Sequence, residues 1–209
     1  MALDTYANLQ AEIALWLRRT DLTSEIPTFI TLAEAQLNRR LRCQQMMSRT
    51  TLTITSSLTA APVDFVAPRS LRLTGTTPTS RLTWVSDEQM DGLLDTSDYT
   101  SGPPRHYTLE GSNFRLSPDP GAGPYTASLS YYARLPALAS NSSNWLLASH
   151  PDAYLYGALS QSAPYLKADD RLAMWAQAFG QIINDINASD TGMGGALEVM
   201  PNTYGAGYI

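Results

Sequence analysis

Residues 151–188, with the sequence PDAYLYGALSQSAPYLKADDRLAMWAQAFGQIINDINA, contain the longest apolar stripe in the chain and decide its fold. Apolar side chains recur there at helical spacing, which predicts two amphipathic helices. The first helix opens at Pro151, and Pro164 should end it because proline removes a backbone donor and crowds the carbonyl group four residues earlier. We interpret Asp169 and Asp170 as the cap of the second helix, whose stripe comprises Leu172, Trp175, Ala176, Phe179, Ile182, Ile183 and Ile186.

A second pair of helices is predicted near the start of the sequence, within residues 4–43. Asp4 or Thr5 can cap the first of these helices, because either side chain can accept a hydrogen bond from a free N–H group of the first turn. Pro27 lies in the first turn of the second helix, where a missing N–H group is harmless. Neither helical pair has a face apolar enough to form a core alone. We therefore expect the two pairs to pack on each other as one four-helix bundle.

The residues between the two helical pairs change from a helical period to a period of two. The segment TLTIT at 51–55 alternates and is rich in β-branched residues, which favours a strand. Ser86 is the predicted cap of a short helix over 86–94, with Gln89 three residues later. Further strands are predicted at 70–73, 82–85, 106–109, 114–116 and 125–134. Together, the predicted strands are enough for a small β-sandwich or barrel.

The predicted fold class is therefore α+β. It is a four-helix bundle built from the N- and C-terminal helical hairpins, with an inserted small antiparallel β-domain and an extended C-terminal arm. We expect the discontinuous bundle to comprise residues 1–47 and 148–188, the β-rich domain residues 48–147, and the arm residues 189–209.

The predicted arm combines glycines with isolated apolar side chains. Glycine makes such a segment costly to order alone, whereas its apolar residues are too many for a plain spacer. We interpret the segment as an arm that becomes ordered on another protein surface, and the alternative interpretation is a frayed chain end. Its candidate contact residues are Met193, Leu197, Val199, Met200, Tyr204, Tyr208 and Ile209.

The charge balance limits the kinds of partner. The chain has 14 Lys and Arg against 19 Asp and Glu, which gives a formal net charge of −5. This argues against a generic binder of the nucleic-acid backbone, which needs an excess of basic residues. One basic cluster nevertheless occurs. It either compensates a helix dipole on a solvated face or contacts an acidic partner surface or DNA phosphates. The cluster consists of Arg39, Arg40, Arg42 and Arg49.

The sequence contains no motif for catalysis or metal binding. The segment GMGG at 192–195 lacks the Gly-Lys-Ser/Thr ending of a phosphate loop and follows a predicted helix rather than a strand. His106 and His150 are far apart, and neither has a second ligand at metal spacing. No Gly-x-Ser-x-Gly elbow is present. We therefore expect no enzyme, no cofactor and no metal.

The cysteine content and the hydropathy of the sequence favour a cytosol-like compartment. The single cysteine, Cys43, permits no disulfide bond within the chain. No stretch approaches the length of a membrane span, and the first residues lack the pattern of a signal peptide. We expect a protein that is made in a cytosol-like compartment and does not contact a membrane.

The order and spacing of several short segments resemble the head-to-tail adaptor proteins of tailed bacteriophages, also called connector proteins. The resemblance spans nearly the whole chain, and no single segment is diagnostic alone. The segments are TYANLQ (5–10), WLRRTDL (16–22), IPTFI (26–30), LAEA (32–35), LNR (37–39), YTLEG (107–111), YYARLP (131–136), NWLL (144–147) and YLYGAL (154–159).

This resemblance implies a structural virion protein that is assembled in the host cytoplasm and lies at the head–tail interface. It implies a homo-oligomeric ring, a dodecamer by the symmetry of the portal, that docks under the portal protein and extends the tunnel for DNA. The opposite side of the ring would receive a tail tube or nozzle protein. DNA would pass through the lumen without sequence-specific binding. Family members with a C-terminal arm use it to grip the portal, which agrees with our interpretation of residues 189–209.

Two alternatives from other functional classes stay open. The 4 Trp and 11 Tyr residues are compatible with a carbohydrate-binding module, or another tail-associated binding module, built on the β-domain. A cell-wall hydrolase associated with the tail would need paired carboxylates in a cleft, and the sequence offers no convincing pair.

Overall fold

The structure is a computed structural model that describes residues 3–75, 80–95, 101–121, 123–166 and 171–193. The chain divides into two compact units. The helical unit comprises Met1–Gln44 and Pro136–Ile209, and the β unit comprises Gln45–Leu135. Helices and strands are both present, so the predicted α+β class is confirmed. The sequence predicted domain boundaries at 47/48 and 147/148, whereas the contacts within each unit place the boundaries at 44/45 and 135/136.

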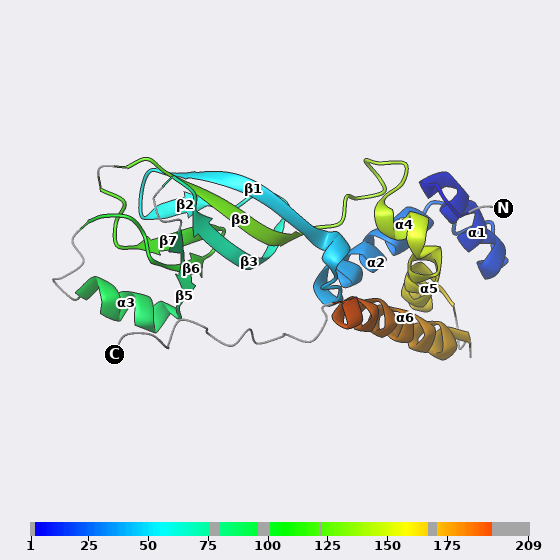
Figure 1. Cartoon of the computed structure of the whole chain (residues 1–209). Helices are drawn as coiled ribbons and strands as arrows, with labels where there is room; N and C mark the ends of the chain where they lie inside the picture. The colour runs from blue at the N-terminus through cyan, green and yellow to red at the C-terminus, as the bar shows by residue number, and fades with distance from the viewer. Residues whose placement is uncertain (1–2, 76–79, 96–100, 122, 167–170, 194–209) are drawn as a thin grey trace. The chain divides into compact units, whose positions relative to one another are not determined.

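The helical unit contains five α-helices in its described residues (Figure 1). Thr5 caps the first helix by accepting a hydrogen bond from the Asn8 N–H group at 3.3 Å, and Pro27 lies in the first turn of the second helix, both as predicted. A 3₁₀ turn, η2 (Ala163–Tyr165), contains Pro164, so the preceding helix ends before that proline, as expected. The helices are α1 (Tyr6–Leu17), α2 (Ile26–Arg40), α4 (Trp145–Ser149), α5 (Pro151–Gln161) and α6 (Arg171–Met193).

Helix α5 is the centre of this unit, because it contacts each of α1, α2, α4 and α6. Gly157 permits the close approach. A Cβ atom there would lie 2.9 Å from Phe179 Cε2 of α6 and 3.1 Å from Ala33 Cβ of α2. The predicted stripe of α6 is buried at Trp175, Phe179, Ile183 and Ile186, while Ala176 is exposed. The core of the unit thus combines helices from both ends of the sequence.

Two buried polar residues attach the loop before α4 to the helices. The Leu138 N–H group donates to Glu34 Oε1 at 2.8 Å, and burial raises the pKa of the Glu34 carboxyl. Asn144 caps α4 through its Oδ1 atom and donates through Nδ2 to Pro136 O and to Tyr154 Oη, at 2.9 and 2.7 Å. Because the hydrogen bonds to Leu138, Tyr154 and Leu147 are buried, they fix the loop on the helical unit.

Helix α6 is longer than predicted, since it continues to Met193. Residues 189–193, which the sequence assigned to the extended arm, are therefore helical. The helical unit also differs from a simple bundle of four helices, because α4 is an additional short helix and all the others gather around α5.

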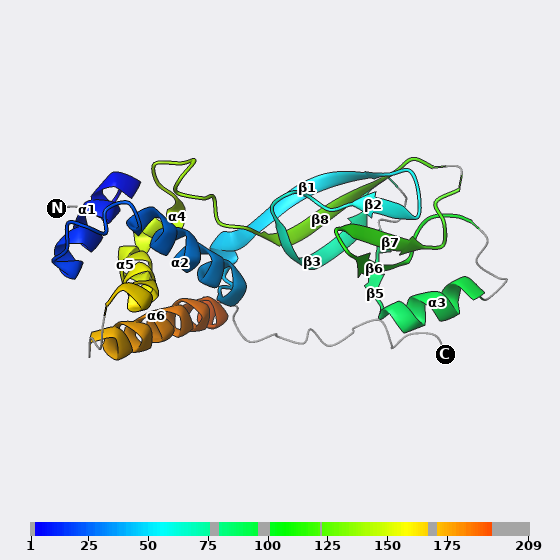
Figure 2. The same ribbon diagram turned by 180° about the vertical axis from the view of Figure 1, so that it is seen from behind.

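The β unit is a sandwich of two four-stranded sheets (Figure 2). The first sheet has the strand order β1-β8-β3-β4 and is antiparallel throughout. The second sheet has the order β2-β7-β6-β5, and its β5–β6 pair is parallel, which corrects the expectation of a purely antiparallel domain. The strands are β1 (Met47–Ile54), β2 (Leu58–Ala60), β3 (Phe65–Leu73), β4 (Ser80–Arg81), β5 (Thr83–Trp84), β6 (His106–Glu110), β7 (Asn113–Ser117) and β8 (Tyr125–Ala133).

Side chains from both sheets form one core, which contains Ile54, Leu71, Leu129, Phe114 and Leu116, all at most 1% exposed. The alternation along each strand sends the neighbouring side chains to the outer faces. On the outer face of the second sheet lies helix α3 (Asp87–Asp95), which contacts β6 and β7. Its predicted capping box is present. The Ser86 N–H group donates to Gln89 Oε1 at 3.2 Å, and the Gln89 N–H group donates to Ser86 Oγ at 3.3 Å.

Candidate functional site

The predicted basic cluster divides between the two units. Arg39, Arg40 and Arg42 lie at the end of α2 in the helical unit, whereas Arg49 lies on β1 in the β unit. All four side chains are exposed. Sequence proximity therefore grouped residues that belong to two compact bodies.

Two of the α2 arginines hold the end of α2 against α6. The guanidinium of Arg40 lies 5.9 Å from the ring centroid of Phe179, and Asn187 Nδ2 donates to the Arg40 carbonyl at 3.1 Å. The Arg42 N–H group donates to Asn187 Oδ1 at 2.9 Å, while its guanidinium donates to the Asn38 carbonyl at 3.0 Å. These contacts occupy the free carbonyl end of the helix, where positive charge stabilises it. Arg40 and Arg42 thus serve the helix junction.

Arg49 belongs to a different group of basic side chains on the outer face of the first sheet. It lines a hollow of about 580 Å³ with three arginines that the sequence analysis did not single out, namely Arg69, Arg72 and Arg81. We call this the arginine hollow; its other lining residues are Pro68, Ser70 and Tyr132.

The order of the strands explains how these arginines meet. Arg49 lies opposite Ser130 of β8, and Ser130 lies opposite Ser70 of β3. An irregularity between Pro68 and Ser70 inserts Arg69, whose Nη1 atom donates to Tyr132 Oη at 3.4 Å. Such a bulge re-aims a side chain on the strand that carries it. The arginines come from β1, β3 and β4; β3 and β4 are consecutive in the sequence, whereas β1 joins them only through β8.

The alternation of residues 71–73 was the signal available in the sequence. Leu71 and Leu73 point into the core, so Arg72 between them must point outward. Grouping Arg72 with Arg49 additionally required the pairing of β1 with β8 and of β8 with β3, which no local pattern encodes.

A second hollow, of about 780 Å³, adjoins the first and shares Pro68, Arg69 and Arg81 with it. It is also lined by Trp84, which is 49% exposed, and by Tyr107. Burial raises the pKa of the Tyr107 hydroxyl, and the nearby charge of Arg81 opposes this rise. Arginine next to an exposed tryptophan is a composition that protein interfaces favour.

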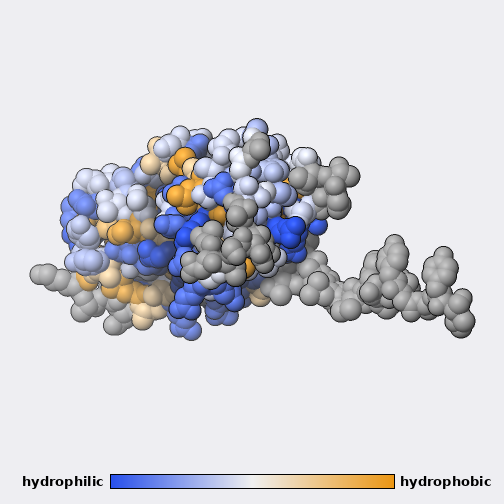
Figure 3. All heavy atoms as spheres, turned by 90° about the vertical axis from the view of Figure 1, so that its left-hand side faces the viewer, coloured by the Kyte–Doolittle hydropathy of each residue, from blue (hydrophilic) through white to orange (hydrophobic). Residues whose placement is uncertain are grey.

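Figure 3 views the β unit from the side on which the labels β2, β7 and α3 lie in Figure 1. The visible surface is strongly hydrophilic in several places, with smaller hydrophobic areas between them. A mixed surface of this kind suits polar contacts with partners better than burial in a large apolar interface.

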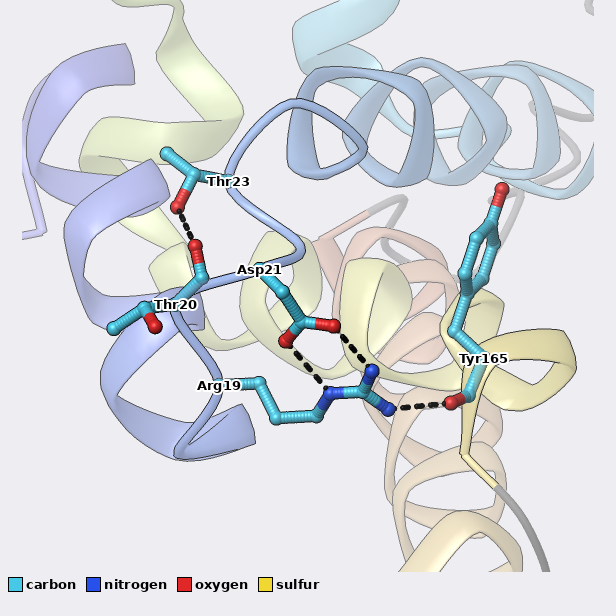
Figure 4. A network of polar contacts seen from close by, with 5 residues as sticks. All are labelled: Arg19, Thr20, Asp21, Thr23 and Tyr165. Atoms are coloured by element: carbon cyan, nitrogen blue, oxygen red, sulfur yellow. Dashed lines mark hydrogen bonds and ion pairs between the residues drawn. The ribbon is translucent and has the colours of Figure 1, made fainter.

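A polar network in the helical unit joins the α1–α2 turn to the residues that follow α5 (Figure 4). Arg19 donates to both carboxylate oxygens of Asp21 and, through Nη1, to the Tyr165 carbonyl at 2.8 Å. The Thr23 hydroxyl donates to the Thr20 carbonyl at 2.9 Å. Hydrogen bonding to Arg19 lowers the pKa of the Asp21 carboxyl. The network is a solvated joint between two helical segments.

Most of the predicted contact residues of the arm lie outside the described residues. Only Met193 falls within them, at the end of α6, and Leu197, Val199, Met200, Tyr204, Tyr208 and Ile209 do not.

The described residues match neither the pattern of a metal site nor that of a membrane-spanning helix. They hold no group of three or more His, Cys, Asp or Glu side chains that could bind a metal ion. Within the same ranges, no helix is both long and apolar enough to span a bilayer. His106 lies on β6 and His150 precedes α5, in different units.

Comparison with known proteins gives one positive result. The model of a protein family described as "SU10 adaptor protein" matches residues 4–200, which span both units and continue past the end of α6. A search of curated proteins found no match.

Proposed function

From the premise that the chain belongs to the SU10 adaptor protein family, we propose that it forms a ring that joins a phage head to its tail. Family membership confirms the resemblance to phage adaptor proteins that the sequence carries, and it makes the chain a structural phage protein. The match over residues 4–200 is the observation that carries the proposal, because it covers both units and not merely one common module.

In this proposal the ring contains twelve copies, docks under the portal protein and lies in the virion at the head–tail interface. It extends the DNA tunnel and receives a tail tube or nozzle protein on its other side. DNA passes through the lumen without sequence-specific contacts, which suits a chain with a net charge of −5. A closed ring repeats one heterologous contact, so each copy needs two different complementary surfaces.

The long helices α1, α2, α5 and α6 would form the bundle that packs into the ring. Exposed apolar side chains on three of these helices support this assignment. They are Leu15 on α1, Leu32 on α2 and Met174 on α6, which are 66%, 46% and 56% exposed. Apolar side chains left in water by an isolated copy are available for burial against a neighbouring copy.

The residues after α6 would serve as the portal-binding arm. Burial of Leu197, Val199, Met200, Tyr204, Tyr208 and Ile209 on the portal would offset the entropy lost when a glycine-rich segment becomes ordered. Arg39, exposed at the end of α2, remains a candidate contact for an acidic partner or for DNA phosphates.

The test is deletion of residues 194–209, which leaves α6 complete to Met193. We expect the truncated protein to keep the helical content of the full chain and to lose docking on portal rings, measured by co-sedimentation and electron microscopy. A matched control retains the full length and replaces Leu197, Val199 and Met200 with Ser. It should weaken docking without removing any backbone. Normal docking by the truncated protein would show that the arm is not the portal-binding element.

A further inference from the structure

Among the described residues, no carboxylate lines the arginine hollow or forms an ion pair with its arginines. Four of its seven lining residues are arginines and none is a carboxylate. In the described ranges, the ion pairs involve Arg19 and Arg115, and none involves Arg49, Arg69, Arg72 or Arg81. An isolated copy therefore presents concentrated positive charge on a protein that is acidic overall.

The strand register places two of these arginines opposite each other, so their like charges repel. Arg72 of β3 and Arg81 of β4 are directly paired across the two strands. Like charges directly opposite each other destabilise a sheet. The repulsion is relieved when a carboxylate approaches both guanidinium groups, because Arg–carboxylate pairs combine charge with two parallel hydrogen bonds.

The same unit carries the complementary charge on helix α3. Asp87, Glu88 and Asp91 are exposed on this helix, and no basic residue occurs within Asp87–Asp95. Asp87 Oδ1 accepts from Thr108 Oγ1 at 2.8 Å, and Asp91 Oδ1 accepts from Arg115 Nη1 at 2.9 Å. Together with Glu110, which lies 3.9 Å from Arg115, these carboxylates form what we call the acidic face.

The arginine hollow and the acidic face lie on opposite sides of the sandwich. Thr108 and Arg115, which hold α3, alternate with the core residues Tyr107 and Leu116, so α3 covers the outer face of the second sheet. Arg72 lies between core residues of β3 and therefore points from the outer face of the first sheet. Figures 1 and 2 both show α3 beside β5 and β6, away from β1 and β8. In the described residues, the side-chain bonds of Asp87 and Asp91 go to Thr108 and Arg115 of the same copy, and not to an arginine of the hollow.

We propose that the arginine hollow binds the acidic face of α3 on a neighbouring copy of the same chain. This inference rests on the proposed ring and names one subunit contact within it. A basic surface and an acidic surface on opposite sides of one unit form a heterologous contact, and such a contact repeats from copy to copy and generates a ring when the rotation between copies closes. Trp84, exposed beside Arg81, supplies an apolar anchor at the edge of the contact.

Duplex DNA is the competing partner for arginines and hydroxyl groups on a sheet. The overall charge of −5 repels DNA, and binding to phosphates generally relies on a wide basic surface. The hollow instead gathers four arginines around one small volume, which suits a few carboxylates of a single helix. The chain itself provides such a helix on every copy.

The experiment uses charge reversal in the full chain. The first variant is Arg72→Glu with Arg81→Glu, and the second is Glu88→Lys with Glu110→Lys. Ring assembly is measured by native mass spectrometry and electron microscopy, alone and on portal rings of the phage that encodes the chain. We expect each variant alone to associate about tenfold more weakly or worse, and the wild-type association to weaken at high ionic strength. An equal mixture of the two variants should recover assembly, because each acidified hollow then meets a basic α3.

Matched controls separate folding from recognition. Arg72→Gln with Arg81→Gln removes the repulsion, so this variant should unfold at a higher temperature than the wild type while it associates more weakly. A merely structural role for these arginines would not produce this opposite pair of changes.

Three outcomes overturn the inference. If both charge-reversed variants form normal rings, the contact is wrong while the proposed ring stands. If Arg72→Glu with Arg81→Glu loses binding to a labelled DNA duplex but keeps its self-association, the hollow is a phosphate-binding surface. If the wild type forms no ring even on portal rings, the proposed function fails together with this contact.

Discussion

The helical unit and the β unit manage charge and packing in different ways. In the helical unit, the basic residues Arg19, Arg40 and Arg42 contact carbonyl groups, a carboxylate or an aromatic ring of the same unit. In the β unit, four arginines share one hollow that contains no carboxylate. The first pattern fixes helices to each other, and the second leaves charge available for a partner. The comparison indicates that Arg19, Arg40 and Arg42 serve contacts within the helical unit, whereas the four arginines of the hollow are available for recognition.

The largest expected effects test whether the two units are independent. Phe114→Ala removes a side chain that is 0% exposed from the sandwich core, and Phe29→Ala removes one that is 1% exposed from the helical core. Each change should cost about 3–5 kcal/mol, because burial is lost and a cavity remains. Hydrogen exchange should rise within residues 45–135 for Phe114→Ala, and within 3–44 and 136–193 for Phe29→Ala. If either change raised exchange equally in both units, the units would fold as one cooperative body.

A smaller effect tests the packing of the helical unit at Gly157. The change Gly157→Ala places a methyl group 2.9 Å from Phe179 and should cost about 1–3 kcal/mol, despite the better helix propensity of alanine. Gly180→Ala on α6 is the matched control, since its Cβ atom would meet only Arg40 Nη2 at 3.8 Å. It should leave stability unchanged or raise it by about 0.5–1 kcal/mol. Urea denaturation measures both, and equal effects of the two changes would contradict the central packing role of α5.

The smallest effect concerns the buried carboxyl of Glu34. Burial raises its pKa above the ordinary value of 4.5. The folded state therefore binds the proton of Glu34 more tightly than the unfolded state does. The free energy of unfolding consequently falls as the pH rises from about 4.5 through the raised pKa. Glu34→Gln keeps an acceptor for the Leu138 N–H group and removes the charge, so its advantage over the wild type should grow as the pH rises.

Glu34→Ala separates charge from hydrogen bonding. It leaves the Leu138 N–H group without its acceptor, which should cost about 1–3 kcal/mol across the pH range. Unfolding free energies at several pH values measure all three proteins. Parallel curves for Glu34→Gln and the wild type would show that ionisation of Glu34 carries no cost in the folded state.

Helical periodicity made the helical unit largely predictable. Trp175, Phe179, Ile183 and Ile186 repeat at a spacing that only a helix places on one face, and all are buried. Pro164 predicted the end of α5 because proline lacks the backbone N–H group, and Thr5 predicted the start of α1 because its hydroxyl accepts a hydrogen bond from a free N–H group. The continuation of α6 to Met193 was missed because Gly192 and Gly194 favour termination, although tertiary packing and an existing helix can override that preference.

Periodicity in the sequence could not predict which strands pair with each other in the two sheets. The strand predicted at 82–85 contains β5 (Thr83–Trp84) but not β4 (Ser80–Arg81), which ends just before it and belongs to the other sheet. Short strands such as Leu58–Ala60 carry too few residues for a period to emerge. Arg69, Arg72 and Arg81 meet Arg49 only after β8 has been placed between β1 and β3. The grouping of these arginines therefore follows from the strand order in the structure and could not be predicted from their positions in the sequence.

The pairing of β1 with β8 has a consequence for how this architecture can change. The chain enters the β unit through β1 and leaves it through β8, and Met47 lies directly opposite Tyr132. A short glycine-rich bridge between those two neighbouring positions would reconnect the helices without rerouting them. The β unit is thus a cassette that can be exchanged or enlarged during evolution while the helical scaffold keeps its connectivity.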